Sequence, residues 1–145
     1  MSFKKDLDKW REAEREFAKR IITKNTYSIE FAPHTAFKEW DIKLRFYKDW
    51  VVVEKTFEVK DDIISEQTWN VWFEFRCYDK PSWIYESKAD YIVYHLWDKF
   101  YYQSRGELLT KLNEVEKREV SWWDYNQSRM FIVDKKYLDV LFKKI

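Results

Sequence analysis

The sequence predicts an α/β or α+β fold, in which a mixed β-sheet core is flanked by helices. Three observations support this class. Apolar residues recur at helical spacing near both ends of the chain and once between them. The intervening segments either alternate apolar with polar residues or run almost continuously apolar, as strands do. With 145 residues and neither an internal repeat nor a linker, a single domain spanning residues 1–145 is expected.

The first expected helix covers residues 6–22 and carries one residue that does not suit its apolar face. Glu14 falls on the apolar stripe, seven residues from both Leu7 and Ile21. Two interpretations stay open: the edge of the stripe is solvated, or the helix presents this carboxylate to a site. The stripe itself consists of Leu7, Trp10, Phe17, Ala18 and Ile21.

Two strands are expected next, over residues 35–46 and 51–60, and their short connection implies an antiparallel hairpin. Side chains alternate between the two faces of a strand. This alternation puts Asp41 on the polar face of the first strand. It also puts Glu58 and Lys60 together on one face of the second strand.

The rest of the chain is expected to supply further strands and two helices. A capping box from Ser104 to Glu107 begins one helix, and a closing helix is expected over residues 135–145. Strands are expected over residues 71–77, 91–96, 100–103 and 129–133, a turn over 79–82, and a short helical turn at most over 87–90.

The composition limits the class of protein. Charged residues make up 37% and apolar residues 46%, as in soluble globular proteins. There is no run of 18 apolar residues and no apolar signal-peptide core, so we expect no membrane partner and a cytoplasmic location. The net charge of +1 argues neither for nor against nucleic acid. The single cysteine, Cys77, excludes an internal disulfide, and His34 and His95 lack a companion cysteine pair, so no zinc site is expected.

The residues best suited to catalysis are Asp41, Glu58 and Lys60. Carboxylates from two neighbouring strands can hold one Mg²⁺, with Mn²⁺ as a substitute. The backbone carbonyl of Val59 and the carboxylate of Glu14 are further candidate ligands. Such a metal activates water and stabilises the leaving oxygen, while Lys60 would orient the water or neutralise charge on a phosphate. The ordinary alternative is an ion pair on a solvated strand face, where Glu-x-Lys is common.

Several segments spread over most of the chain carry a resemblance to a known family. They are Ala13-Glu14, Asp41 to Lys43, Phe57 to Lys60, Asn70 to Phe75, Lys80 to Ser82, Lys88 to Tyr91 and Asp124 to Val133. In these segments the chain resembles the PD-(D/E)XK nuclease superfamily, which has the restriction-endonuclease-like fold and includes Holliday junction resolvases. More narrowly, it looks like a group of small phage nucleases of that superfamily.

The resemblance implies a Mg²⁺-dependent DNA endonuclease that hydrolyses phosphodiester bonds on a restriction-endonuclease-like mixed sheet. By the same resemblance, Asp41, Glu58 and Lys60 are the catalytic core, and Glu14 matches a helix glutamate seen in part of the superfamily. A resolvase-like homodimer that selects DNA by its structure agrees with the absence of a separate sequence-reading domain. For a phage protein, the expected location is the cytoplasm of the bacterial host.

Two further residues lie in segments that match the family, and their roles are open. Glu74 either supports the metal ligands or is a solvated strand residue, and Lys88 either touches phosphate or is solvated. An alternative function keeps the nuclease fold as a catalytically weak or inactive DNA-binding or virion-associated module. A third interpretation is a structural domain in which Glu-x-Lys occurs by chance.

One feature of the composition is abnormal: the chain has one glycine and nine tryptophans, whereas an average chain of this length has roughly ten glycines. We hypothesise that several of these tryptophans are glycines encoded by UGA and read through a code in which UGA means tryptophan. The alternative is an unusual aromatic-rich protein. Tryptophan stands where a tight turn, a family-like segment or a close helix contact would favour a small residue at Trp10, Trp50, Trp69, Trp83, Trp97, Trp122 and Trp123.

Overall fold

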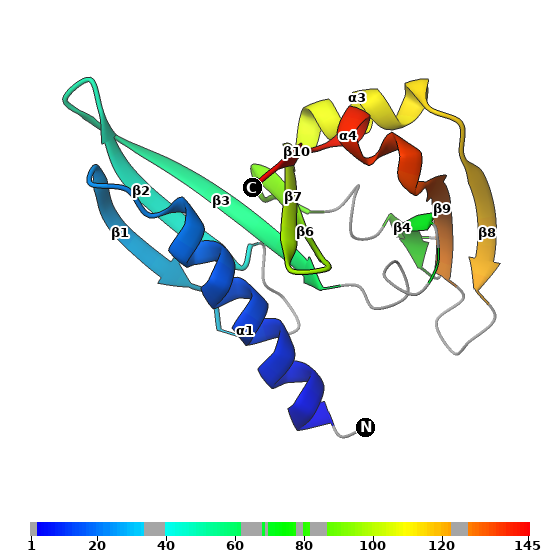
Figure 1. Cartoon of the computed structure of the whole chain (residues 1–145), viewed down its shortest axis with the longest axis horizontal. Helices are drawn as coiled ribbons and strands as arrows, with labels where there is room; N and C mark the ends of the chain where they lie inside the picture. The colour runs from blue at the N-terminus through cyan, green and yellow to red at the C-terminus, as the bar shows by residue number, and fades with distance from the viewer. Residues whose placement is uncertain are drawn as a thin grey trace.

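The computed structural model describes residues 3–33, 40–61, 68, 70–77, 80–81, 87–122 and 128–145, with side chains excluded at 3–10, 61, 74, 76–77, 80–81, 121–122 and 128. In this part of the chain the protein is a mixed α+β structure (Figure 1). The expected class, a mixed sheet flanked by helices, is therefore confirmed. The helices are α1 (Phe3–Ile21), α3 (Arg105–Glu114) and α4 (Leu138–Leu141).

The larger sheet is mixed and has six strands. All neighbouring strands are antiparallel except β3 and β6, which are parallel with Phe57 opposite Tyr91. The β2–β3 hairpin projects well beyond the rest of the sheet, with β1 beside it (Figure 1). In spatial order the strands are β1 (Thr26–Phe31), β2 (Ile42–Lys48), β3 (Val51–Asp61), β6 (Tyr91–Leu96), β7 (Lys99–Ser104) and β10 (Lys143–Lys144).

The smaller sheet is antiparallel and has four strands. In spatial order they are β5 (Lys80–Pro81), β4 (Asn70–Cys77), β9 (Ser128–Asp134) and β8 (Arg118–Trp122). Alternation along β4 buries Val71, Phe73 and Phe75 on one face, as the sequence predicts.

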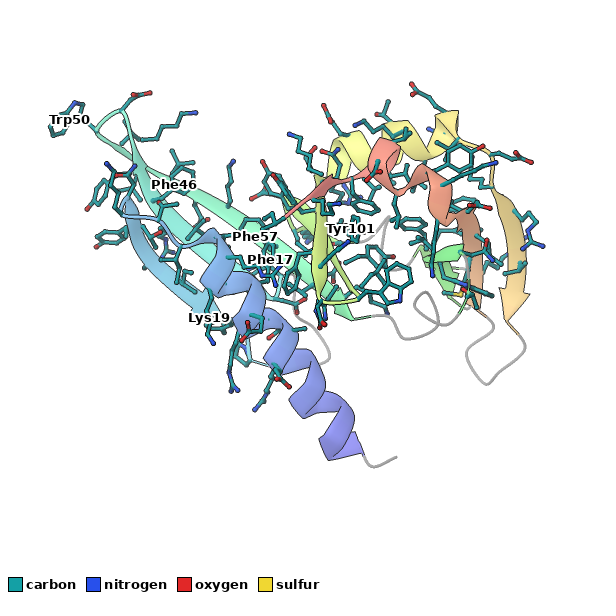
Figure 2. The ribbon with its side chains drawn as sticks, in the orientation of Figure 1. Phe17, Lys19, Phe46, Trp50, Phe57 and Tyr101 are labelled. Carbon is teal, nitrogen blue, oxygen red and sulfur yellow. The ribbon has the colours of Figure 1, made fainter. Side chains whose placement is uncertain are left out.

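Helix α1 covers one face of the larger sheet. Phe17 is fully buried there among Ile42, Phe57, Val93 and Phe100. The rings of Phe17 and Phe57 meet edge to face with their centroids 5.3 Å apart, between α1 and β3 (Figure 2). This apolar contact fixes α1 against the strand that carries Glu58 and Lys60.

A second core lies between the opposite face of the larger sheet and the smaller sheet. Ile92 and Tyr94 of β6 are fully buried in it, together with Phe73 of β4 and Leu108 of α3. Because Val93 faces the α1 core, β6 is buried on both faces. Its nearly continuous apolar sequence predicts this position.

Both tight hairpins of the larger sheet place residues in the left-handed region of backbone conformation. In the β2–β3 loop, Asp49 and Trp50 have φ values of 51° and 69°. In the β6–β7 loop, Trp97 and Asp98 have φ values of 50° and 60°. Two-residue hairpin turns with positive φ at both central positions strongly favour glycine or asparagine. Both tryptophans therefore occupy positions suited to glycine.

The closing helix expected over residues 135–145 is wrong in its extent. Residues Lys135–Tyr137 form a 3₁₀ turn, α4 ends at Leu141, and Phe142 is already extended with φ −130° and ψ 155°. The chain then pairs with β7, and Ile145 exchanges backbone hydrogen bonds with Phe100. Pairing with the edge of β7 gives the backbone groups of residues 143–145 hydrogen-bond partners, which the last carbonyls of a helix lack within the helix.

Other expected elements are confirmed with small shifts in their bounds. The capping box is present at α3, where the Ser104 hydroxyl accepts a hydrogen bond from the Glu107 N–H at 3.4 Å. Strands β1 and β8 were not predicted, although Tyr27, Ile29 and Phe31 alternate with polar residues as in a strand. Residues 80 and 81, expected in a turn, form the short strand β5, and the expected strand over 35–46 lies partly outside the described residues.

Candidate active site

Asp41 lies where β2 separates from its neighbours. The chain bends at this residue, whose N–H donates to the Phe57 carbonyl at 2.8 Å and whose carbonyl accepts from the Ala32 N–H at 2.9 Å. Ile42 is paired with Phe57, and the Asp41 N–H also goes to Phe57 while its carbonyl turns toward β1, so the regular register ends at Ile42. Asp41 therefore lies at the end of the hairpin where β3 continues into Glu58 and Lys60.

The Asp41 side chain adds a further hydrogen bond to β3. Its Oδ2 atom accepts from the Val59 N–H at 2.7 Å, and the side chain is 2% exposed. In an antiparallel strand the N–H and C=O of one residue point the same way. The Val59 carbonyl therefore faces the side of β3 on which Asp41 lies, as expected for a candidate ligand.

Glu58 and Lys60 project from the face of β3 opposite to α1. Phe57 and Val59 face the α1 core, so the residues that alternate with them face the other way. Glu58 is partly buried, with its Oε2 atom shielded from solvent, whereas Lys60 is exposed. The Glu58 carboxylate is thus partly shielded from solvent, and Lys60, two residues along the same face of β3, is accessible to a large substrate.

Glu14 approaches the same region from the other side. It is 4% exposed on α1, so the interpretation that the edge of the helix stripe is solvated is wrong. Together with Ala32 and Pro33 it lines a cavity of about 230 Å³, and the Ala32 N–H bonds Asp41. Glu14 therefore lies next to the segment that positions Asp41, on the α1 side of the sheet.

A pair of residues that the sequence did not single out anchors β3 on the face that bears Glu58. Asp90 Oδ2 accepts from both the N–H and the hydroxyl of Thr56, at 2.9 and 3.1 Å. The Thr56 hydroxyl in turn accepts from the Asp90 N–H at 3.0 Å. Thr56 shares its face with Glu58, and this spacing was the only signal in the sequence.

The two accessory candidates, Lys88 and Glu74, lie on segments other than those that carry Asp41 and Glu58. Lys88 is exposed and precedes β6, at the Thr56 end of β3, away from Lys60. Glu74 belongs to β4 and pairs with Met130 through its backbone, but its side chain lies outside the described residues. His34 also lies outside them, and the ring of His95 stacks on Phe100 with centroids 4.6 Å apart.

The donor atoms near Asp41 suit a hard cation. The described residues contain no group of three or more His, Cys, Asp or Glu side chains that could hold a metal ion. Magnesium needs fewer, because it usually keeps several waters and takes one or two protein carboxylates. Asp41, whose carboxylate accepts from the Val59 N–H, and Glu58, the residue before Val59, each have one carboxylate oxygen shielded from solvent. Carboxylate oxygens are the ligands that magnesium takes from proteins.

Comparison of the chain with protein-family models, with curated proteins and with solved structures gives no match. Within the described residues, no helix is long and apolar enough to cross a membrane.

Proposed function

We propose that this chain is a Mg²⁺-dependent DNA endonuclease of the PD-(D/E)XK type, with a restriction-endonuclease-like core and DNA as its partner. The observation that carries the proposal is the 2.7 Å hydrogen bond from the Val59 N–H to Asp41. It holds a buried carboxylate against Val59, the residue after Glu58, at the point where β2 leaves β3. A strand-face ion pair between Glu58 and Lys60 would not require a buried aspartate there.

In this proposal Asp41, Glu58 and the Val59 carbonyl hold the cation, and Glu14 supports the site from α1. When bound, the cation would supply an activated water and neutralise charge on the phosphate. Lys60, at the exposed end of the group, orients the water by donating a hydrogen bond to it and offsets charge that develops on the phosphoryl oxygens. Phage origin and structure-selective cleavage by a homodimer belong to the same proposal.

The first prediction concerns Asp41 and separates its two tasks. Asp41→Asn keeps an oxygen that accepts from the Val59 N–H but removes the charge that binds a cation. We expect stability near that of the unchanged protein and a loss of cleavage of at least about 100-fold. Cleavage of branched, duplex and single-stranded DNA would be measured with Mg²⁺ and with EDTA.

Two further variants complete this test. Asp41→Ala loses the bond to Val59 as well as the charge, so it should also be less stable. Lys60 has an exposed side chain, so Lys60→Ala should change the free energy of unfolding by no more than about 0.5 kcal/mol. The same substitution should abolish cleavage. Mg²⁺-dependent cleavage that survives both Asp41→Asn and Lys60→Ala would refute the assignment. DNA binding without cleavage in the unchanged protein would favour the inactive DNA-binding module.

A further inference from the structure

A second cavity lies on the α1 side of the larger sheet, opposite to the face that bears Glu58. It occupies about 490 Å³ between the end of α1 and strands β1, β2, β3, β6, β7 and β10. This volume is within the range of small-molecule sites, which is about 300–1,000 Å³. The residues that matter for its chemistry are four aromatic side chains and two lysines: Phe46, Phe57, Tyr91, Tyr102, Lys55 and Lys143.

The cavity has an aromatic wall. The rings of Phe57 and Tyr91 are stacked with centroids 5.2 Å apart and an interplanar angle of 24°, and Tyr102 follows with its ring 6.4 Å from Tyr91. Phe46 contributes from β2, farther toward the tip of the hairpin than Phe57 (Figure 2). Phe57 is itself buried, so the accessible part of the wall comes from Tyr91, Tyr102 and Phe46, which are partly exposed. These rings suit a planar aromatic ligand, because flat rings gain contact area and stacking energy against them.

The charged side chains that line the described cavity, Arg20, Lys55 and Lys143, are all positive. Lys55 Nζ lies 3.1 Å from the Tyr91 hydroxyl, and 5.1 and 5.7 Å from the ring centroids of Tyr91 and Phe46. Neither Lys55 nor Lys143 forms an ion pair with the described residues, and no carboxylate side chain lines the described cavity. Arg20 is already engaged by the carbonyls of Asp98 and Ile145. The two lysines are therefore available to an anion.

We propose that this cavity binds a nucleotide, with its base against the aromatic wall and its phosphate at Lys55 and Lys143. Aromatic stacking combined with lysine contacts to phosphate is how proteins hold single nucleotides of any sequence. The ligand is either a free mononucleotide or one nucleotide of a single DNA strand. The site is independent of the proposed catalysis, because Lys55 and Phe57 face α1 whereas Glu58 and Lys60 face away from it.

Calorimetric titration in EDTA tests the proposal without any cleavage. The probes are thymidine 5′-monophosphate, thymidine and a short oligothymidylate. We expect the monophosphate to bind at least about tenfold more tightly than thymidine, because only the monophosphate engages the lysines. Lys55→Ala should weaken its binding about tenfold, Lys55→Arg should restore most of it, and Lys143→Ala should weaken it less. Lys48→Ala, an exposed lysine on β2 outside the cavity, is the matched control and should bind like the unchanged protein.

The outcomes also separate the two sources of the nucleotide. If the monophosphate and the oligothymidylate bind with comparable affinity, the ligand is a free nucleotide. If the oligothymidylate binds much more tightly, and Lys55→Ala weakens that binding, the ligand is a DNA strand. Equal binding of thymidine and its monophosphate, unchanged binding by a folded Lys55→Ala, or no binding of any probe overturns the proposal. Circular dichroism of each variant reports whether it is folded. Because cleavage is suppressed by EDTA, failure of the nuclease proposal leaves these readouts intact.

Discussion

At the scale of single residues, Trp50 has a backbone conformation that is unfavourable for a residue with a Cβ atom. It has a φ value of 69° at the tip of the β2–β3 hairpin, and its side chain is 101% exposed (Figure 2). A residue with a Cβ atom loses roughly 1–2 kcal/mol in the left-handed conformation. The exposed ring of Trp50 gains little contact to offset that cost. The register of the hairpin, set by many strand residues, prevails over the preference of one turn residue.

Replacing Trp50 by glycine should therefore stabilise the protein. For Trp50→Gly we expect a gain of about 1 kcal/mol in the free energy of unfolding, measured by urea denaturation. Trp50→Ala is the matched control, because it removes the ring but keeps the Cβ atom, and it should give no gain. Equal effects of the two substitutions would show that the ring, not the backbone, is responsible.

The same turns bear on the hypothesis that some tryptophans are misread glycines. Trp50 and Trp97 both have positive φ, in two independent hairpins. Trp97 also contacts a cation, with Lys135 Nζ 3.7 Å from its ring centroid, so its replacement has an opposing cost that Trp50 lacks. The coding DNA decides the matter, because TGG codons at positions 50, 69, 83, 122 and 123 would reject the hypothesis.

The sequence predicts that Asp41 and Glu58 lie at the same end of the hairpin, for a physical reason. The alternation of apolar residues along both strands sets the register, and pairing of Ile42 with Phe57 brings the residue before Ile42 and the residue after Phe57 to one end of the strand pair. The burial of Glu14 was not predictable, because an apolar stripe with one carboxylate fits both a solvated edge and an internal site. Only the distant segment at Ala32, beside the helix, distinguishes these two cases.

At the scale of elements, the parallel pair β3 and β6 depends on a contact at its start. Thr56 is 9% exposed, and its three hydrogen bonds with Asp90 join the two strands before their ladder begins. Parallel strands are joined by long connections, so no tight turn fixes their register. We infer that this contact sets the register in which Phe57 lies opposite Tyr91.

Removing Asp90 should test the importance of this contact. For Asp90→Ala we expect a loss of about 2 kcal/mol in the free energy of unfolding, because hydrogen bonds to a charged group contribute about 1.5–3 kcal/mol. Thr56→Val and the double variant complete a cycle, which should give a coupling energy above about 1 kcal/mol. Additive effects of the two substitutions would mean that the pair acts through separate contacts.

The C-terminal segment marks a limit of prediction from local pattern. Leu138, Leu141 and Phe142 are buried with helical spacing, which the sequence displays correctly. The turn to an extended conformation at Phe142 depends on β7, whose open edge lies about 40 residues earlier in the chain and accepts a partner there. Local periodicity carries no information about such an edge, so the sequence predicts a longer helix than the structure contains.

At the scale of the whole molecule, the two sheets are joined through shared side chains. Tyr94 of the larger sheet is fully buried, donates its hydroxyl hydrogen to the Trp72 carbonyl at 2.9 Å, and meets the Phe73 ring at 5.4 Å between centroids. Its neighbour Val93 belongs to the α1 core. A single strand therefore links both cores, and disruption of one is expected to reach the other.

This arrangement predicts one cooperative unfolding transition, as expected for a single domain. Hydrogen exchange should give similar opening free energies for the most protected amides of β3 in the larger sheet and β9 in the smaller sheet. Tyr94→Ala removes a fully buried ring and should lower both values together by about 3–5 kcal/mol. Val120→Ala, on the edge strand β8, should leave both nearly unchanged, since this side chain is only partly buried. If Tyr94→Ala lowers the opening free energy only in β9, the molecule instead consists of two units that unfold separately. The candidate active site and the nucleotide cavity would then both belong to the unit that contains α1.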